Sequence, residues 1–209
     1  MTHSLHRAGS PESLQRDFVF LMISALGFNE KGAKDKFIKF NDIIMKYNPV
    51  NAGNGRLGNL YKNSGGKLMT DNMVDRMCFH AVFRDSEIVS SVIKELKEAD
   101  LGLSVVVSGL FDHVGECCNK AGVTRHTIEY SLGRWGKTEL LPPEDLLPVH
   151  SMCGHALISV NLIKDMLEDV RSGRRTALEA AGELAKPCVC GIFNTERAAE
   201  ILEQLARDN

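Results

Sequence analysis

The sequence of 209 residues contains no long apolar run and no excess of charge of either sign. A membrane span needs about 18–20 consecutive apolar residues, and no stretch here approaches that length. Lys and Arg number 25 against 27 Asp and Glu, a formal net charge of −2, so no strong field would attract nucleic acid or anionic lipid. The 44% hydrophobic and 25% charged residues are typical of a globular chain. We therefore expect neither nucleic acid nor a membrane as a partner.

An apolar run at residues 18–28, with small residues at 25–27, resembles the core of a secretory leader. However, Glu12 and Asp17 lie where a leader should be purely basic, and the Ser-Pro-Glu sequence at 10–12 is typical of a helix start. We therefore expect a cytoplasmic protein. Disulfides are kept reduced in the cytoplasm, and clustered cysteines there indicate metal or redox chemistry.

Residues 1–70 are expected to form an N-terminal helical region with a Gly- and Asn-rich loop. After the capping residue Ser10, apolar residues recur at three- and four-residue spacing up to Gly27, which predicts a first helix. A similar apolar stripe predicts a second helix over 33–47. Residues 51–67, rich in Gly and Asn, are expected to form the loop.

Residues 71–140 are expected to form a small parallel-sheet βαβαβ core. Three consecutive valines at 105–107 predict a strand buried on both faces. Ligands usually bind beyond the carboxyl ends of parallel strands. Residues 141–209 are expected to form a C-terminal helical region, and all three regions to pack as one compact unit. The core elements are predicted as strands at 78–83, 103–107 and 124–132, which alternate with helices at 87–99 and 109–121.

Two short motifs in the C-terminal region combine soft metal ligands. Met152-Cys153-Gly154-His155 and Cys188-Val189-Cys190-Gly191 each place two candidate ligands one residue apart, beside a glycine that permits a tight bend. Each motif precedes a predicted helix, whose N-terminal dipole favours thiolate over thiol. Two predicted helices joined at Gly173 separate the motifs, so the chain can go out and return. This arrangement would bring the three cysteines and His155 together.

Two kinds of metal centre fit these four residues. An iron–sulfur cluster would bind Cys153, Cys188 and Cys190 and leave one iron open to His155, an outside ligand or a substrate. A zinc ion would take all four ligands in a closed tetrahedron. The sequence lacks the Cys-x2-Cys pair that is typical of both kinds of centre. Three alternatives therefore remain: cysteines buried in the core, a redox dithiol and a lone nucleophile. We favour the cluster, because three cysteines without an obvious fourth thiolate describe a cluster with one open iron, which can act as a Lewis acid. A chain of this length can also bury enough surface without a zinc staple.

Other cysteines and histidines are weaker candidates. His113 shares a predicted helical face with Cys117 and is a candidate acid–base group, although burial in the core is the simpler interpretation of Cys117 and Cys118. Cys78 and His80 share a strand face, and there too we favour a place in the core. His3, His6 and Arg7 are expected to form a solvated tail, unless it folds back over the core.

Basic residues in two loops are candidate contacts for an anionic substrate. Arg56 lies in Gly53-Asn54-Gly55-Arg56-Leu57-Gly58, which matches a dinucleotide-binding pattern but lacks the required preceding strand. Arg56, with Lys62 and Lys67, could instead clamp an anion from a flexible loop. Arg134 follows the third predicted strand and is a second candidate contact.

The sequence therefore predicts a cytoplasmic metalloprotein, an iron–sulfur enzyme that acts on a small anionic metabolite. Cys153, Cys188 and Cys190 would bind the cluster, His155 would be a fourth ligand or proton donor, and His113 an acid–base group. Arg56 and Arg134 would contact the substrate, and the chain could form a homo-oligomer. One alternative is a zinc-stabilised binding or accessory protein without catalytic activity, and another is a thiol enzyme that uses Cys190 or Cys153 without metal.

Overall fold

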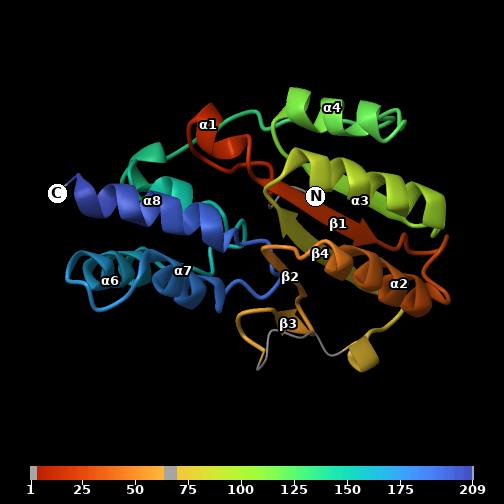
Figure 1. The fold of residues 1–209 in the computed structure, drawn as a ribbon, viewed down its shortest axis with the longest axis horizontal. Helices are drawn as coiled ribbons and strands as arrows, with labels where there is room; N and C mark the ends of the chain where they lie inside the picture. Colours follow the sequence, from red (N-terminus) through yellow and green to blue (C-terminus); the bar gives the residue numbers. More distant parts are fainter. Residues whose placement is uncertain (1–3, 64–69, 209) are drawn as a thin grey trace.

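The computed structural model describes residues 4–63 and 70–208. Among these residues, five strands form one sheet in the order β3-β2-β4-β1-β5, and every neighbouring pair is antiparallel (Figure 1). The expected parallel core is therefore wrong. The strands are β1 (Phe18–Ile23), β2 (Asn51–Asn54), β3 (Gly58–Asn59), β4 (Cys78–Phe83) and β5 (Ser104–Ser108).

Two strand–helix–strand crossovers interlock to give this order. Helix α2 (Ala33–Lys46) links β1 to β2, and helix α3 (Ser86–Ala99) links β4 to β5. The two strands of each crossover run in the same direction, but a strand of the other crossover lies between them. This is the β-α-β-β-α-β succession of a split sheet, extended at one edge by β3. The predicted strand and helix at 78–83 and 87–99 are confirmed, and the error lies in which strands are neighbours.

Strand β1 occupies the place of the first predicted helix. Helix α1 (Pro11–Leu14) is a single turn, capped by Ser10, and the apolar residues that follow it form the strand instead. Side chains from Phe18 to Met22 are almost fully buried, because β1 lies between β4 and β5 with packed layers on both faces. A short apolar run buried on every side has no strand periodicity, so spacing alone could not separate strand from helix.

The second and third predicted strands also differ from the structure. Strand β5 lies at the edge of the sheet, and Val105 and Val106 are 38% and 39% exposed, so the predicted burial on both faces is wrong. Residues 124–132, all of which the structure describes, form no strand. Part of the predicted Gly/Asn loop is also more ordered than expected, because β2 and β3 form a short antiparallel hairpin there.

Helices cover the sheet in two groups, each with its own apolar core (Figure 1). Because alternate residues of a strand face opposite sides, Phe20 packs toward α2 and α3, and Val19 packs toward the C-terminal helices. Helix α4 (Phe111–Lys120) joins the first group through α3. The second group consists of α5 (Leu147–His150), α6 (Val160–Arg171), α7 (Ala177–Ala185) and α8 (Thr195–Arg207).

Four helices begin at a polar capping side chain. In each, a polar side chain accepts a hydrogen bond from a backbone N–H in the first helical turn, which satisfies a group that the helix itself cannot pair. The caps are Asp85 for α3, Ser159 for α6, Thr176 for α7 and Asn194 for α8.

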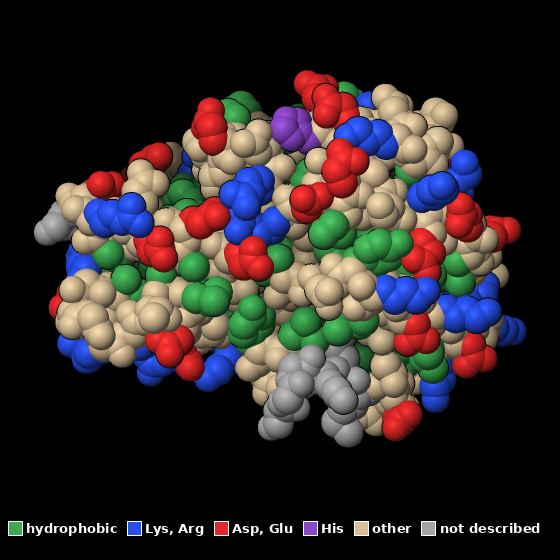
Figure 2. Space-filling model, viewed as in Figure 1, with side chains coloured by type: hydrophobic (Ala, Val, Ile, Leu, Met, Phe, Trp, Pro, Cys, Tyr) green, Lys and Arg blue, Asp and Glu red, His purple; other side chains and the backbone are tan. Residues whose placement is uncertain are grey.

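The surface carries charges of both signs. Figure 2 shows Lys and Arg side chains interspersed with Asp and Glu on the face viewed, without a large area of one sign. Within residues 4–63 and 70–208, no helix has the length and apolar character needed to cross a membrane.

Candidate functional site

The two cysteine motifs meet in the C-terminal half of the structure. The Sγ atoms of Cys188 and Cys190 lie 4.0 Å apart, and the Sγ of Cys190 lies 3.6 Å from Nδ1 of His155. Cys153 lies close enough to Cys188 for each thiol to shift the pKa of the other, so the four side chains form a continuous series. The three cysteines are buried and His155 is exposed, so the series runs from the core to the surface.

Helices α6 and α7 bring the motifs together as the spacing predicted. They pack against each other, and the chain reverses between them at Gly173, whose φ of 69° is in the left-handed region that glycine adopts readily. The first motif precedes α6 and the second follows α7, so both lie at the same end of the helix pair.

The β2–β3 hairpin supports the second motif. The buried side chain of Asn59 donates through Nδ2 to the carbonyl oxygens of Ala185 and Cys188, at 2.9 and 2.8 Å. Gly191, with φ of 73°, lies directly against the backbone of β2, where a Cβ atom would overlap Ala52 and Gly53. The loop that carries Cys188 and Cys190 is thus fixed on the sheet by one side chain and one close backbone approach.

Arg7 connects the two motifs. Its Nη2 donates to the carbonyl oxygen of Met152, beside Cys153, at 3.3 Å, and also to the carbonyl oxygen of Ile192, two residues beyond Cys190. The side chain is 5% exposed, so the expected solvated tail is wrong for this residue. One guanidinium therefore holds both cysteine loops at a fixed separation.

Asp17 holds Arg7 in place within a buried ionic network. Arg7 Nη1 donates to both carboxylate oxygens, at 2.5 and 2.6 Å, and Arg197 Nη1 donates to Oδ2 at 2.9 Å. Asn194 Nδ2 donates to Oδ1 at 3.0 Å. Burial alone would raise the pKa of Asp17, but the two guanidinium charges and these hydrogen bonds outweigh it and lower the pKa. The carboxylate is ionised and its negative charge is shared by two cations.

The thiols of the site differ in acidity. A hydrogen bond with Cys188, together with burial, raises the pKa of Cys153. The bond with Cys153 lowers the pKa of Cys188, but Cys190 and burial outweigh it and raise that pKa to about 12. The pKa of Cys190 is lowered, because Cys188 donates to its sulfur. The expectation that helix N-termini acidify all three thiols is therefore wrong for Cys153 and Cys188, and Cys190 is the most acidic thiol of the three.

The four side chains do not yet surround one point. Over the described part of the chain, no three His, Cys, Asp or Glu side chains are placed so that they could hold one metal ion as they stand. Cys153 and His155 lie at opposite ends of the series of contacts, with Cys188 and Cys190 between them. Side-chain rotation is required before all four could share an ion.

Several candidates lie elsewhere. His113 is on α4, in the group of helices on the opposite side of the sheet from the cysteine loops. Arg56, in the β2–β3 turn, and Arg134, in the irregular segment after α4, are both exposed. The core interpretation fits Cys117, Cys118 and His80, which are buried, while Cys78 is half-buried. His3 and Lys67 lie outside the described residues.

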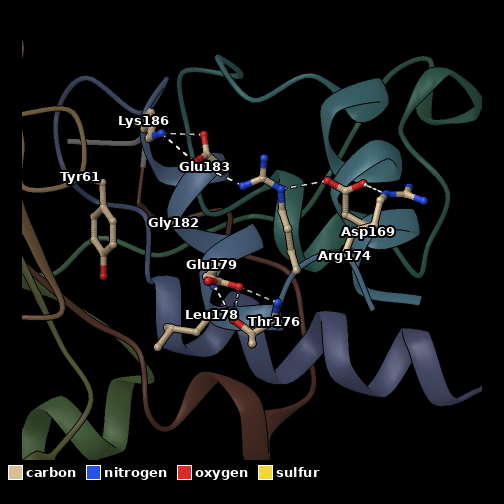
Figure 3. Close-up of a pocket in the computed structure, with 10 residues that line it drawn as sticks. Tyr61, Asp169, Arg174, Thr176, Leu178, Glu179, Gly182, Glu183 and Lys186 are labelled. Atoms are coloured by element: carbon tan, nitrogen blue, oxygen red, sulfur yellow. Dashed lines mark hydrogen bonds and ion pairs between the residues drawn. The ribbon is translucent and has the colours of Figure 1, made fainter. Parts of the chain in front are cut away.

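A charged cavity of about 700 Å³ lies beside α7 (Figure 3). Its cations are paired: Arg174 and Arg175 donate to Asp169 at 2.8 and 2.9 Å, and Lys186 donates to Glu183 at 2.7 Å. The two arginine pairs fasten the α6–α7 turn and the lysine pair lies at the end of α7, so these cations are already paired within the chain.

Sequence reasoning overlooked the residues that support the site. Asp17 and Arg197 are charged residues within segments that are otherwise apolar on one face. A charged side chain at a position expected to be buried needs an opposite charge nearby, and this was the available indication that the two residues pair. Asn59 could not have been found, because its partners lie more than 120 residues away.

Comparison with known proteins assigns no family to the chain. No protein-family model matches it, and neither a curated protein nor a solved structure does.

Proposed function

We propose that the chain is a cytoplasmic metalloprotein in which Cys153, Cys188, Cys190 and His155 bind one metal ion. The observation that carries this proposal is the spacing of the contacts. In a tetrahedral zinc site, metal–ligand bonds of about 2.3 Å to sulfur and 2.0–2.1 Å to nitrogen place two sulfurs roughly 3.8 Å apart and sulfur and nitrogen roughly 3.5 Å apart. The corresponding distances here are 4.0 and 3.6 Å.

The same spacing favours a single ion over the iron–sulfur cluster that sequence reasoning favoured. In a four-iron cluster each cysteine binds a different iron, so the sulfurs stand roughly 6 Å apart. Cys188 and Cys190 would have to separate by a large fraction of their present distance to bind such a cluster, whereas a zinc ion would leave that distance almost unchanged.

Rotation of Cys153 and His155 would complete the tetrahedron. His155 is exposed, so its ring can turn at the surface without repacking the core, and Cys153 already interacts with Cys188, one of the two central cysteines. The backbone of both loops would stay in place, because Arg7 and Asn59 hold it from outside the ligand set. All six cysteines are free thiols, as metal binding in a reducing compartment requires.

The arrangement supports a closed, structural site more than a catalytic one. None of the four ligands lines either the charged cavity beside α7 or the larger cavity along β5. A closed Cys3His site joins its loops and supplies folding free energy. We therefore propose a binding or accessory protein that zinc stabilises, rather than an enzyme acting on a small anionic metabolite.

Metal analysis tests the proposal. Protein purified without oxygen, from cells supplied with zinc and iron, should be colourless and contain one zinc per chain. Cys188→Ser should lose most of the metal, and Cys118→Ser, which alters a buried cysteine in the other core, should retain it. Brown protein absorbing near about 400 nm would show a cluster and overturn the zinc assignment. Protein that contains neither zinc nor iron would overturn the proposal that these residues bind a metal.

One observation favours a second candidate, a thiol enzyme. Cys190 Sγ lies 3.6 Å from the imidazole of His155, a pairing that can activate a sulfur nucleophile. Iodoacetamide should then modify Cys190 much faster than the other five cysteines in metal-free protein, and His155→Ala should abolish that difference. Equal slow labelling of all six would exclude this candidate.

A further inference from the structure

Residues 124–141, which we call the arm, expose an unusual number of large apolar side chains. Single exposed apolar residues are common on monomers, whereas several on one continuous segment mark an interaction site. The arm contains no strand and only one short turn of helix, η3 (Thr138–Leu140). Six of its side chains are between 41% and 83% exposed: Ile128, Tyr130, Leu132, Trp135, Leu140 and Leu141.

Strand β5 offers an unpaired edge beside the arm. Among the described residues it pairs only with β1, so its outer edge presents free backbone donors and acceptors. Val105 and Val106 are partly exposed on that edge. A cavity of about 1000 Å³ follows the strand and is bounded by β5, by the start of α4 and by residues 124–131 of the arm. An apolar edge of this kind is a template for another strand.

The arm has the sequence pattern of such a strand. Ile128, Tyr130 and Leu132 alternate with polar residues, which is the pattern of a strand with one apolar face. Its own chain holds the arm only near its beginning and middle. Arg125 Nη1 donates to the Phe111 carbonyl oxygen at 3.0 Å, the rings of Tyr130 and Phe111 lie 5.4 Å apart, and His6 Nδ1 lies 2.9 Å from Ser131 Oγ. Beyond these contacts the apolar side chains face solvent.

We propose that two copies of the chain form a two-fold symmetric dimer in which the arm of each copy pairs with β5 of the other. Among the described residues, one edge of β5 pairs with no strand, and the strand-like segment of the arm belongs to no sheet. A two-fold axis would let each copy pair its arm with the edge of the other. The contact at Arg125 can remain, whereas the Tyr130–Phe111 and Ser131–His6 contacts must open for the residues beyond Arg125 to cross. The low net charge of −2 adds little repulsion between copies.

The exposed area is large enough for a stable dimer. From their exposed fractions, and with about 150–250 Å² for a whole aromatic side chain, the six side chains offer on the order of 700 Å². A standard interface buries about 800 Å² per partner. A small ligand in the cavity would not account for this surface, because Leu132, Trp135 and Leu140 do not line the cavity.

The oligomeric state and the single tryptophan together test the proposal. Light scattering after size exclusion should give twice the mass of one chain, and the double variant Ile128→Asp/Tyr130→Asp should give the mass of one. Leu178→Asp alters an equally exposed apolar residue on α7 and should remain dimeric. Trp135 is the only tryptophan, so its emission should shift to longer wavelength as the wild type dissociates over a dilution series.

Circular dichroism checks that the double variant is folded, and Leu132→Asp provides a second, highly exposed position if it is not. Wild type that is monomeric at every concentration would overturn the proposal. A dimer that survives both arm variants, or one whose dissociation leaves Trp135 emission unchanged, would overturn the assignment to the arm. If wild type and Leu178→Asp are dimers and both arm variants are monomers, the result supports the proposal.

Discussion

Replacement of Asp17 by Asn should destabilise the protein strongly, because it leaves two buried guanidinium groups without a counter-ion. The side chains of Arg7 and Arg197 are 5% and 0% exposed, so water cannot replace the lost charge. An amide can still accept a hydrogen bond, but it cannot balance two positive charges. Removing one partner of a buried ion pair typically costs about 3–5 kcal/mol, and we expect a loss of unfolding free energy in that range.

A second aspartate provides a matched control. Asp169 also receives hydrogen bonds from two arginines, Arg174 and Arg175, at 2.8 and 2.9 Å. These arginines are 58% and 40% exposed, so water can solvate them when the carboxylate is removed. Exposed pairs contribute about 0–1 kcal/mol, and Asp169→Asn should lose no more than that.

Urea denaturation followed by circular dichroism measures both variants. The slope of unfolding free energy against urea should be the same for both, so that the midpoints report stability. The reasoning would be refuted if Asp17→Asn lost about 1 kcal/mol or less, or no more than Asp169→Asn. Such a result would mean that the buried guanidinium groups are stable without the carboxylate.

Three further outcomes follow from the same geometry. Gly191→Ala should prevent normal folding, because its Cβ would overlap the β2 backbone at Ala52. Gly173 has a similar φ but open space around it, so Gly173→Ala should cost only about 1 kcal/mol of unfolding free energy. Thermal melts compare the two variants. Asn59→Ala should lower stability by about 1–3 kcal/mol in the same melts, because two buried carbonyl groups lose their donor. Folding lowers the pKa of Asp17, so the stability that its carboxylate contributes is complete above the unfolded pKa of about 3.9 and is lost as pH falls through the folded pKa. The difference in unfolding free energy between wild type and Asp17→Asn should therefore narrow in urea titrations from pH 5 to pH 2.

Features encoded over a few neighbouring residues could be predicted, and those that depend on distant partners could not. Ser159 and Thr176 act as helix caps with partners within three residues, so their patterns identify α6 and α7. The reversal at Gly173 is equally local. Together they predicted that the cysteine motifs could meet, although no local pattern could show which of the three thiols is the most acidic.

The sheet illustrates the opposite case. Residues 18–23 have the composition of a buried helix as much as of a strand, and only pairing with β4 and β5 decides between them. If residues 18–23 are predicted as a helix, β4 and β5 become neighbours, and a parallel core follows from that error. The pattern at 124–132 was that of a strand, but a strand needs a partner, and none is supplied by the described residues of the same chain.

The network around Asp17 also constrains when the molecule can finish folding. Its aspartate is near the start of the sequence, whereas Asn194 and Arg197 are contributed by the cap and first turn of α8, about 180 residues later. On the ribosome, the carboxylate therefore lacks two of its partners until α8 has emerged from the exit tunnel. Contacts of such long sequence separation form late. Newly made chains should accordingly depend on chaperones, or remain open to proteases, until α8 has been synthesised.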